Sequence, residues 1–322
     1  MAASAATLAT LSNGQKIPVL GLGTWQGADD PSVVEQAVRD AVDAGYRHFD
    51  CAYVYGNEKE IGKALREKIA EGVVKREDLF ITTKLWNTMH KVEDVIPACK
   101  ESVENFGLGY VDLYLMHWPF SYSKKAKDLW PVDEEGKPLL GSEDYIDTWR
   151  GMEECVKLGL TKSIGLSNFN SEQIDRILSI ATIKPVMNQV ECHPNLNQKK
   201  LREFCAKRGI AITSYSPLGS PLRPWAQEGD PKIIIEQPEV IEIAKKYGKT
   251  PVQVVLRYLV DINTFPIPKS ASKERIKQNI DIFDFKLTPE EISVIDKFDC
   301  GMRVCPAEAY KDHPYYPFNV EF

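Results

Sequence analysis

The chain has 322 residues, 43% of them hydrophobic and 27% charged, and its 40 basic and 46 acidic side chains leave a formal net charge of −6. A chain of this length and ordinary composition buries a sizeable core without disulfides or metals. Charges of both signs are mixed along it, and no apolar stretch approaches the roughly 18 residues that cross a bilayer, which argues against nucleic-acid and membrane-surface roles.

The first segment with a clear pattern, 7–18, predicts a short β-hairpin, in which Asn13-Gly14 would supply the two positive-φ residues of a type I′ turn. After it, short apolar runs alternate with segments of helical periodicity. The expected strands are 20–23, 48–50, 80–84, 111–117, 163–167, 186–191, 210–215 and 264–267. The expected helices are 31–44, 57–71, 91–106, 145–158, 171–180, 197–208, one within 238–260, and 273–280.

Eight strand–helix units in about 250 residues predict a parallel sheet closed into a (β/α)8 TIM barrel, with residues 1–322 forming one domain. The competing α/β fold is a doubly wound sheet, which would carry G-x-G-x-x-G after its first strand. Gly21, Gly23 and Gly27 give G-x-G-x-x-x-G, which is one residue too long. We therefore favour the barrel.

Three long segments interrupt the regular scheme, at 120–144, at 219–238 and in the C-terminal tail 299–322. Each follows a strand or ends the chain, so we expect all three at one rim of the barrel as substrate loops. Thr288-Pro289-Glu290-Glu291 predicts a capped extra helix that introduces the tail.

Four ionisable side chains follow three consecutive predicted strands: Asp50 and Tyr55, then Lys84, then His117. The carboxyl ends of barrel strands form the active-site rim, so these groups should converge. Carbonyl reduction needs a proton donor at the carbonyl oxygen. A lysine held by a carboxylate lowers the pKa of a tyrosine, and a histidine orients the carbonyl, so these residue types suit that chemistry.

Each residue has a structural interpretation as well. Lys84 at a strand end suits a solvated charge, His117 a core histidine, Tyr55 a packing aromatic, and Asp50 a helix cap. Their joint placement at consecutive strand ends favours the catalytic interpretation.

Several long motifs resemble those of the aldo-keto reductase superfamily, and most closely the monomeric animal aldose and aldehyde reductases. The segments that carry the resemblance are GYRHFDCAYVYGNEKEIG (45–62), ITTKLW (81–86), DLYLMHWP (112–119), GLSNF (165–169), NQVECHP (188–194) and IPKSASKERIKQN (267–279). The likeness extends from the hairpin into the tail at 313–318. It implies that Tyr55 is the general acid, that Lys84 and Asp50 form its ion pair, and that His117 orients the carbonyl.

The resemblance also implies an NADP(H) site. Its nicotinamide end would involve Asp50 and Gly23, Thr24, Trp25, Ser167, Asn168, Gln189 and Tyr215. Its pyrophosphate and adenosine ends would involve Ser216, Leu218, Ser220, Lys269, Ser270, Ser272, Arg275, Gln278 and Asn279. Lys269 and Arg275 bracket a Ser-Ala-Ser turn at a predicted helix start, which suits the 2′-phosphate of NADPH. An NAD site would more often present a carboxylate, and we expect Lys273 to lie in solvent.

Aromatic residues at the rim suggest an apolar substrate pocket. The expected pocket residues, beside Tyr55 and His117, are Trp25, Trp86, Trp118, Trp130, Trp225, Met302 and Cys305. Ordinary rim packing is the alternative interpretation, above all for Trp225. Met302 stands where members of the superfamily often carry an aromatic residue, which suggests a roomier tail side.

Seven scattered cysteines without a Cys-x-x-Cys pair, and no Lys or Arg in the first 14 residues, predict a cytoplasmic protein without a signal peptide. No metal-ligand spacing is present, so we expect no metal. We expect a monomeric NADPH-dependent reductase of small aldehydes and ketones. The alternatives are a hydroxysteroid- or ecdysteroid-type ketone reductase, a redox-sensing accessory subunit like potassium-channel β subunits, and a lens-type structural protein.

Overall fold

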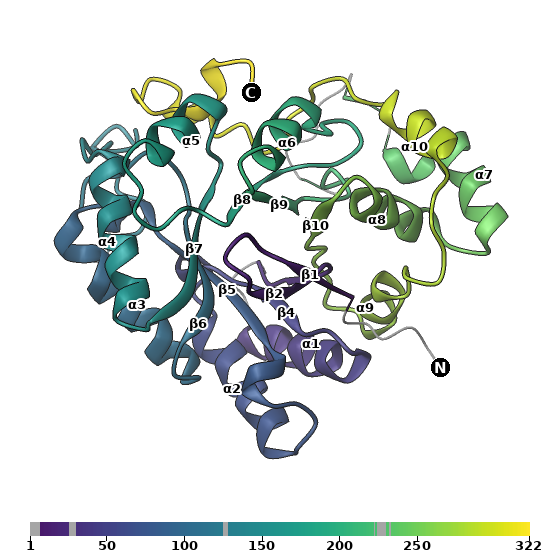
Figure 1. Cartoon of the computed structure of the whole chain (residues 1–322), viewed down its shortest axis with the longest axis horizontal. Coiled ribbons are helices and arrows are strands. Elements are labelled where there is room, and N and C mark those ends of the chain that lie inside the picture. The colour runs from purple at the N-terminus through teal and green to yellow at the C-terminus, as the bar shows by residue number, and fades with distance from the viewer. Residues whose placement is uncertain (1–6, 26–29, 125–127, 222, 224–229, 232) are drawn as a thin grey trace.

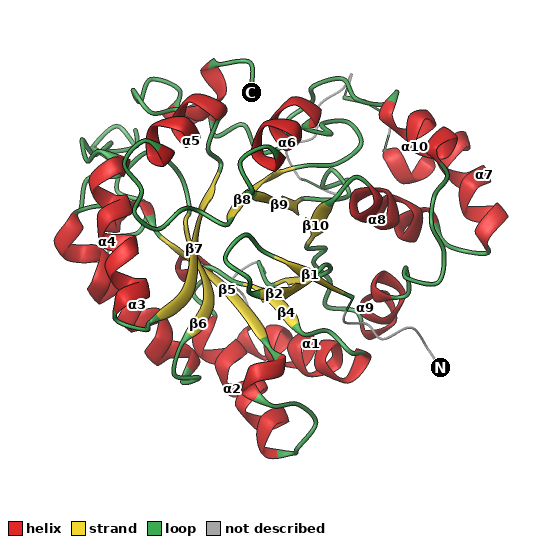
Figure 2. Ribbon diagram, in the orientation of Figure 1, coloured by secondary structure: helices red, strands yellow, loops and turns green. Residues whose placement is uncertain are grey.

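The computed structural model describes residues 7–25, 30–124, 128–221, 223, 230–231 and 233–322. Within these residues, eight parallel strands form a ring with helices packed around the outside (Figures 1 and 2). In chain order the strands are β3 (Leu22–Gly23), β4 (His48–Asp50), β5 (Phe80–Leu85), β6 (Val111–Met116), β7 (Thr161–Ser167), β8 (Met187–Glu191), β9 (Ala211–Tyr215) and β10 (Thr264–Pro266). Each strand pairs with the next along the chain, so every strand's carboxyl end points to the same rim.

The ring closes between its first strand and the segment that follows its last. Gly21 N–H donates to the carbonyl of Pro266 and Gly23 N–H to that of Pro268, both at 3.1 Å. Gly23 also forms a parallel bridge with Lys269. The predicted (β/α)8 barrel is therefore confirmed, with its hairpin, and the doubly wound sheet is excluded.

The glycines at this seam have a packing role. A Cβ atom on Gly21 would lie 2.7 Å from the His48 ring, and one on Gly23 would lie 2.7 Å from the carbonyl oxygen of Ile267. Side chains at these positions would hold the first and last strands apart. The motif that superficially resembled a dinucleotide fingerprint thus serves barrel closure, although its third glycine, Gly27, lies outside the described residues.

The helices of the described residues lie outside the ring. They are α1 (Pro31–Ala44), α2 (Glu58–Ala70), α3 (Val92–Phe106), α4 (Tyr145–Lys157), α5 (Ser171–Leu178), α6 (Lys199–Ala206), α7 (Pro238–Tyr247), α8 (Pro251–Asp261), α9 (Lys273–Ile280) and α10 (Pro289–Asp296). Short 3₁₀ turns occur at η1 (Tyr53–Tyr55), η2 (Arg76–Asp78), η3 (Asn87–Met89), η4 (Ile234–Glu236), η5 (Glu308–Tyr310) and η6 (Pro317–Asn319).

The segment 238–260, where one helix was expected, contains two. Gly248 takes a left-handed conformation that ends α7, and Pro251 occupies the first turn of α8. Thr250 and Gln253 form a reciprocal capping box at the start of α8. A glycine stop followed by a capped proline start divides a helical pattern that periodicity alone leaves continuous.

The N-terminal hairpin closes the opposite end of the barrel from the rim. Its strands are β1 (Leu8–Thr10) and β2 (Lys16–Pro18), and Ile17 is fully buried. Ile17 and Leu11 pack onto buried side chains of the barrel interior: Phe80, Leu113, Leu115, Val186, Met187 and Phe265. The hairpin therefore acts as an apolar plug at the amino ends of the strands.

The turn of this hairpin is not the expected type I′ turn. Gly14 has φ 87°, but Asn13 is absent from the positive-φ residues of the described chain. Gly14 N–H donates to Leu11 O, and Leu11 N–H to Gln15 O, so the loop is one residue longer. The Asn13 side chain donates to Ser163 Oγ at 2.7 Å, a contact with the barrel that only the tertiary fold supplies.

The C-terminal tail follows α10 and crosses the rim. Its η5 residue Tyr310 stacks on Phe120 and Tyr122 of the 120–144 segment, with ring centroids 5.2 and 5.0 Å apart. Its last residue is held at the start of α5, where Ser171 N–H and Oγ both donate to Phe322 O. The tail and the 120–144 loop therefore lie together at the rim.

We predict that Gly62→Ala destabilises the barrel although alanine is the better helix former. Gly62 lies inside α2, and a Cβ atom there would lie 2.3 Å from the backbone oxygen of Phe106 at the end of α3. Overpacking of this kind costs about 1–3 kcal/mol, which outweighs the gain of about 1 kcal/mol in helix propensity. Urea denaturation measures the change.

The control is Lys59→Ala, on the exposed face of the same helix. It should change the free energy of unfolding by no more than about 0.5 kcal/mol. A Gly62→Ala protein as stable as the parent would show that α2 and α3 can separate without loss.

Candidate active site

A buried ion pair lies at the rim between β4 and β5. Asp50 ends β4, and Lys84 is the fifth residue of the neighbouring β5. The two residues are 2% and 0% exposed. Lys84 Nζ donates to Asp50 Oδ2 at 2.7 Å. Two charges removed from water need further hydrogen bonds to remain buried.

The remaining polar atoms of this pair are bonded as well. Gln189 at β8 donates from Nε2 to Asp50 Oδ1 at 2.7 Å, and Lys84 Nζ also donates to Cys51 O at 2.7 Å. Thr24 Oγ1 donates to Asp50 O at 2.9 Å. Predicted residues from four separate chain segments therefore form one connected network.

Tyr55 is placed above this pair by the short turn η1. Gly56 follows it with φ 66°, a left-handed conformation that turns the chain into α2. The Tyr55 hydroxyl lies 3.5 Å from Lys84 Nζ, and that ammonium lies 5.1 Å from the centre of the Tyr55 ring. The predicted acid and its lysine are therefore adjacent.

The electrostatic balance at Tyr55 differs from the expected one. Burial raises the pKa of the Tyr55 phenol above its usual value, and the Lys84 ammonium opposes this effect without overcoming it. The expectation of a lowered pKa is therefore wrong for the site as described, because desolvation penalises the tyrosinate more than one ammonium stabilises it. Tyr55 is a protonated acid at neutral pH.

Lys84 remains charged in spite of its surroundings. Burial lowers the pKa of Lys84, but the adjacent Asp50 carboxylate and Tyr55 raise it, and the net result lies above the usual value. A permanent positive charge therefore faces the Tyr55 hydroxyl.

His117 directly follows β6 and lies beside Tyr55. Their ring centroids are 6.1 Å apart, and the Trp86 ring lies 5.2 Å from His117 on another side. Burial lowers the pKa of His117 well below its usual value, and the positive charge of Lys84 and the neighbouring His90 lower it further. His117 is therefore neutral at pH 7, with one ring nitrogen able to donate a hydrogen bond and the other able to accept one.

The residues predicted to hold a nicotinamide group form a second polar chain along the rim. Ser167 Oγ donates to Gln189 O at 3.0 Å, Asn168 Nδ2 donates to His117 O at 3.0 Å, and Tyr215 OH donates to Asn168 Oδ1 at 2.8 Å. Asn168 has φ 62°, an unusual conformation for a residue other than glycine. Such strained residues concentrate at functional sites.

The predicted pyrophosphate loop continues from β9. Ser216 and Ser220 both have positive φ, at 47° and 45°, and Ser220 Oγ donates to Ser216 Oγ at 3.3 Å. With Leu218 they connect β9 to the 219–238 segment, of which only part is described. Two serines in left-handed conformations side by side again mark this segment as functionally constrained.

The predicted adenosine pocket lies at the start of α9. Ser272 is the N-cap, accepting from Arg275 N–H, and Ser270 Oγ accepts from Ser272 N–H. Lys269, Arg275 and Gln278 are exposed, and Asn279 is buried. A helix N-terminus flanked by two exposed cations suits a phosphate group, so these residues fit the adenosine end of NADP(H).

Lys273 differs from Lys269 and Arg275. Its side chain is 55% exposed, as expected, but its ammonium lies 3.3 Å from the Asp40 carboxylate on α1. This pairing leaves Lys273 less available to a phosphate than its neighbours.

Aromatic side chains line the rim above His117. Trp86 is buried, donates to Leu129 O at 2.7 Å, and packs against Trp130 with ring centroids 4.6 Å apart. Trp118 packs on Phe120 and on Phe318 of the tail. Among the aromatic residues that the structure describes, Trp25 and Trp130 remain mostly exposed, at 59% and 53%. Trp225 lies outside the described residues.

The two predicted tail residues of the pocket differ in their surroundings. Cys305 is mostly buried, which raises the pKa of its thiol to about 12, and Ser216 and Tyr215 are among its neighbours. Met302 lines a small cavity with His193, Asn195, Leu218 and neighbouring residues. Tyr55 is not part of that lining.

Two contributors to the site were not predicted. Asn57 is the N-cap residue of α2, but its side chain bonds elsewhere: Nδ2 donates to Thr24 O at 2.9 Å. This bond holds the segment after β3 against η1. Glu191, at the end of β8, is fully buried. A charged residue at the end of a predicted strand was the available signal for Glu191, whereas the role of Asn57 depends on a contact 33 residues away.

Among the described residues, no three His, Cys, Asp or Glu side chains are grouped so as to hold a metal ion. Over the same part of the chain, no helix is long and apolar enough to cross a membrane.

Comparison with known proteins gives a consistent result. The model of the Aldo/keto reductase family matches residues 19–299. Aldo-keto reductase family 1 member A1-A of Danio rerio is 47% identical over 319 residues, which are 96% of this chain and 97% of that protein. The human family 1 member A1 is 44% identical over 325 residues, which are 98% and 99% of the two chains.

Two solved structures share the fold over nearly their whole length. An aldo-keto reductase of Bombyx mori in complex with NADP has a TM-score of 0.89 and 43% identity, covering 97% of this chain and 99% of that one. The aldose reductase of Schistosoma japonicum has a TM-score of 0.91 and 42% identity, covering 98% and 99%.

We predict that Lys84→Met destabilises the protein by about 3–5 kcal/mol, because it leaves the Asp50 carboxylate buried without its counter-charge. Urea denaturation at pH 7 measures the loss. The control is Lys137→Met, which removes an ion pair whose two side chains are 73% and 72% exposed and should cost at most about 1 kcal/mol. Equal losses in the two variants would contradict the buried pair's role.

Proposed function

The chain belongs to the aldo/keto reductase family, and we propose that it reduces aldehydes and ketones to alcohols with NADPH as the hydride donor and Tyr55 as the proton donor. The family makes the chain an oxidoreductase. The observation that carries the proposal is the Tyr55 hydroxyl 3.5 Å from a fully buried Lys84, which is itself 2.7 Å from Asp50.

The proposed reaction adds a hydride to the carbonyl carbon and a proton to the carbonyl oxygen. NADPH, when bound, supplies the hydride. Tyr55 supplies the proton from its hydroxyl, which burial keeps protonated at neutral pH. The two additions together convert the carbonyl into an alcohol and leave a tyrosinate that regains its proton from solvent.

The buried ion pair prepares Tyr55 for that transfer. As the proton leaves, negative charge develops on the phenol oxygen, and the Lys84 ammonium 3.5 Å away stabilises it. Asp50 and the carbonyl of Cys51 hold that ammonium in place. The positive charge of Lys84 is therefore in position before the reaction starts, and stabilising the developing negative charge needs no rearrangement of water.

Neutral His117 completes the proposed site. A neutral imidazole does not give up its remaining N–H proton near neutral pH, so it does not compete with Tyr55 as the acid. Its N–H group can still orient a carbonyl oxygen toward the Tyr55 hydroxyl. The backbone carbonyl of His117 is bonded to Asn168, which links the carbonyl-binding and cofactor-binding residues.

The apolar rim favours compact carbonyl compounds with an apolar body. Trp86, Trp118, Trp130 and the ring of Tyr122 form an aromatic wall beside His117. A panel of aromatic aldehydes, sugars and ketosteroids, followed by loss of absorbance from NADPH, tests the substrate class. We also propose that the chain is a one-domain cytoplasmic monomer.

Replacing Tyr55 by Phe is expected to lower the rate of carbonyl reduction by about 10²–10⁴-fold, the usual contribution of a positioned general acid. NADPH affinity, measured by fluorescence titration, should change little because only one hydroxyl is lost. A variant that reduces every substrate of the parent at a near-normal rate would overturn the assignment of Tyr55.

The parent's pH profile follows from the same residue. The protonated phenol is the active form, and its pKa lies above the ordinary tyrosine value, so reduction should be constant through neutral pH and fall only on the alkaline side. A rate that already declines near pH 6.5 would instead identify a histidine acid, in conflict with a neutral His117.

Cofactor preference is tested at the start of α9. Lys269→Ala and Arg275→Ala should each weaken NADPH binding by about 10- to 100-fold, the value of one charge-assisted hydrogen bond to a phosphate, and leave NADH binding nearly unchanged. Lys273→Ala in the same turn is the matched control and should have a smaller effect, because Lys273 is paired with Asp40. Equal losses for both cofactors would contradict a 2′-phosphate pocket.

A further inference from the structure

Glu191 is a carboxylate with no exposed surface at the end of β8, yet it takes no part in the proposed chemistry. An uncompensated buried charge costs several kcal/mol, so its partners need an explanation. Within the described residues, Glu191 pairs with a histidine, His193, and not with a lysine or arginine. Its other partners are two backbone amides of the tail.

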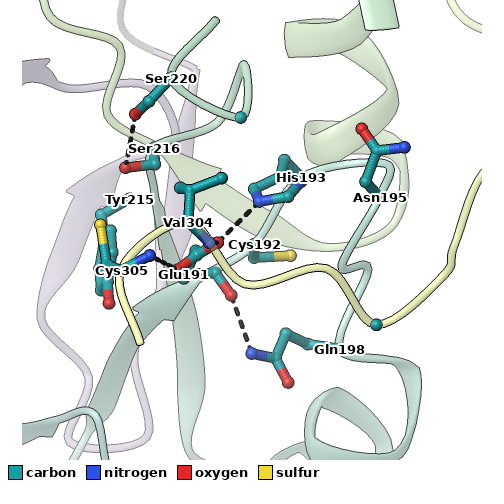
Figure 3. A network of polar contacts seen from close by, with 12 residues as sticks. Glu191, Cys192, His193, Asn195, Gln198, Tyr215, Ser216, Ser220, Val304 and Cys305 are labelled. Atoms are coloured by element: carbon teal, nitrogen blue, oxygen red, sulfur yellow. Dashed lines mark hydrogen bonds and ion pairs between the residues drawn. The ribbon is translucent and has the colours of Figure 1, made fainter. Parts of the chain in front are cut away.

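The three contacts divide between both carboxylate oxygens (Figure 3). Val304 N–H donates to Oε1 at 2.6 Å, and Cys305 N–H donates to Oε2 at 2.8 Å. His193 Nε2 lies 2.8 Å from Oε1 and supplies the third N–H. An ionised carboxylate only accepts hydrogen bonds, so all three donors match it.

The tail is tied to the same loop by its backbone just before this point. Cys300 N–H and Met302 N–H both donate to Asn195 O at 3.1 Å. The segment 300–305 therefore runs along the segment 191–195 with attachments at both ends. In Figure 3 the tail passes directly over Glu191.

This fastening point lies next to the reaction centre. Cys305 lies beside Tyr215 in Figure 3, and Tyr215 bonds to Asn168, which in turn bonds to the His117 backbone. Five residues further along the tail, Tyr310 stacks on the aromatic wall formed with the 120–144 loop. A displacement of 304–305 would move the tail side of the substrate pocket.

His193 fixes the direction of the carboxylate. Its ring is buried, and the position of a Cβ atom on Gly219 would lie 3.7 Å from Nδ1, so the loop after β9 lies against one side of it. The small cavity that His193 shares with Met302 and Leu218 lies between the tail and this loop. The imidazole is thus held between the two segments while Nε2 faces Glu191.

We propose that Glu191 is a positioning residue for substrate selection: its carboxylate, aligned by His193, fixes the tail amides of Val304 and Cys305 and so sets the tail wall of the pocket. The proposal rests on the proposed carbonyl reduction. Aldehydes large enough to reach the tail depend on Glu191, whereas a two-carbon aldehyde held by Tyr55 and His117 alone does not.

Glu191→Gln is the test variant because it preserves shape but replaces one acceptor oxygen by an NH2 donor. Each carboxylate oxygen accepts from one tail N–H, so the new NH2 group faces either Val304 N–H or Cys305 N–H. At least one contact therefore becomes repulsive. We expect KM for 4-nitrobenzaldehyde to rise about tenfold, in line with the loss of a hydrogen bond to a charged group, while kcat/KM for glycolaldehyde stays within about twofold of the parent.

A matched control distinguishes positioning from stability. Asp112 is the second residue of β6, near the opposite end of the barrel, is 3% exposed, and accepts from Arg76 and from Ile81 N–H. Asp112→Asn should lower the thermal midpoint as Glu191→Gln does and leave both KM values unchanged. An equal rise in KM for 4-nitrobenzaldehyde in Glu191→Gln and Asp112→Asn would overturn the proposal.

Hydrogen exchange of the Val304 and Cys305 amides gives a readout that does not need activity. Both should exchange at least about tenfold faster in Glu191→Gln than in the parent, and at the parental rate in Asp112→Asn. Unchanged exchange would overturn the proposal. If the parent reduced no carbonyl compound but the exchange rates shifted as expected, the proposed function would fail while the fastening of the tail stood.

Two further variants keep the test decisive if Glu191→Gln does not fold. Glu191→Asp keeps the charge but is one methylene too short to reach both amides, and His193→Phe keeps the ring and removes its N–H. Each should raise KM for the aromatic aldehyde and leave glycolaldehyde turnover intact. Parental KM values in both would overturn the proposal.

Discussion

The site depends on one buried pair of opposite charges. Lys84 and Asp50 lie 2.7 Å apart at the rim with almost no contact with water, and such a pair is stable only when its remaining atoms are bonded. Gln189 and the carbonyl of Cys51 provide those bonds from neighbouring segments. A deeply desolvated ammonium beside a phenol is what distinguishes Tyr55 from an ordinary rim tyrosine.

The barrel is what allows that pair to be assembled. Parallel strands in sequential order bring every carboxyl end to one rim, and the close approach of Gly21 and Gly23 to the segment after β10 completes the ring. The hairpin plug then seals the other end with apolar side chains. The polar and charged side chains of the site are therefore concentrated at the rim, and apolar side chains fill the other end.

The segments outside the regular scheme supply what the strands lack. The 120–144 loop contributes Trp130, which packs on Trp86 beside His117, and the tail contributes Tyr310, which stacks on Phe120. The tail is itself held to β8 through Glu191. Backbone bonds add to these contacts: Tyr122 and Leu140 form a bridge within the loop, and the tail donates from Cys300 N–H to Asn195 O. The position of the pocket wall therefore depends on both side-chain packing and backbone hydrogen bonds of these segments.

From sequence alone, alternating periodicity determined the barrel, and the residues at strand ends determined which side chains would meet, because strand order in such a fold follows chain order. Tertiary structure alone decided the sign of the pKa shift at Tyr55, since burial is a property of the packed site and outweighs the nearby Lys84. It also decided the turn at Asn13, whose side chain contacts Ser163, and the proposed role of Glu191, whose tail partners Val304 and Cys305 lie more than 110 residues away. Local patterns carry no information on such distant contacts.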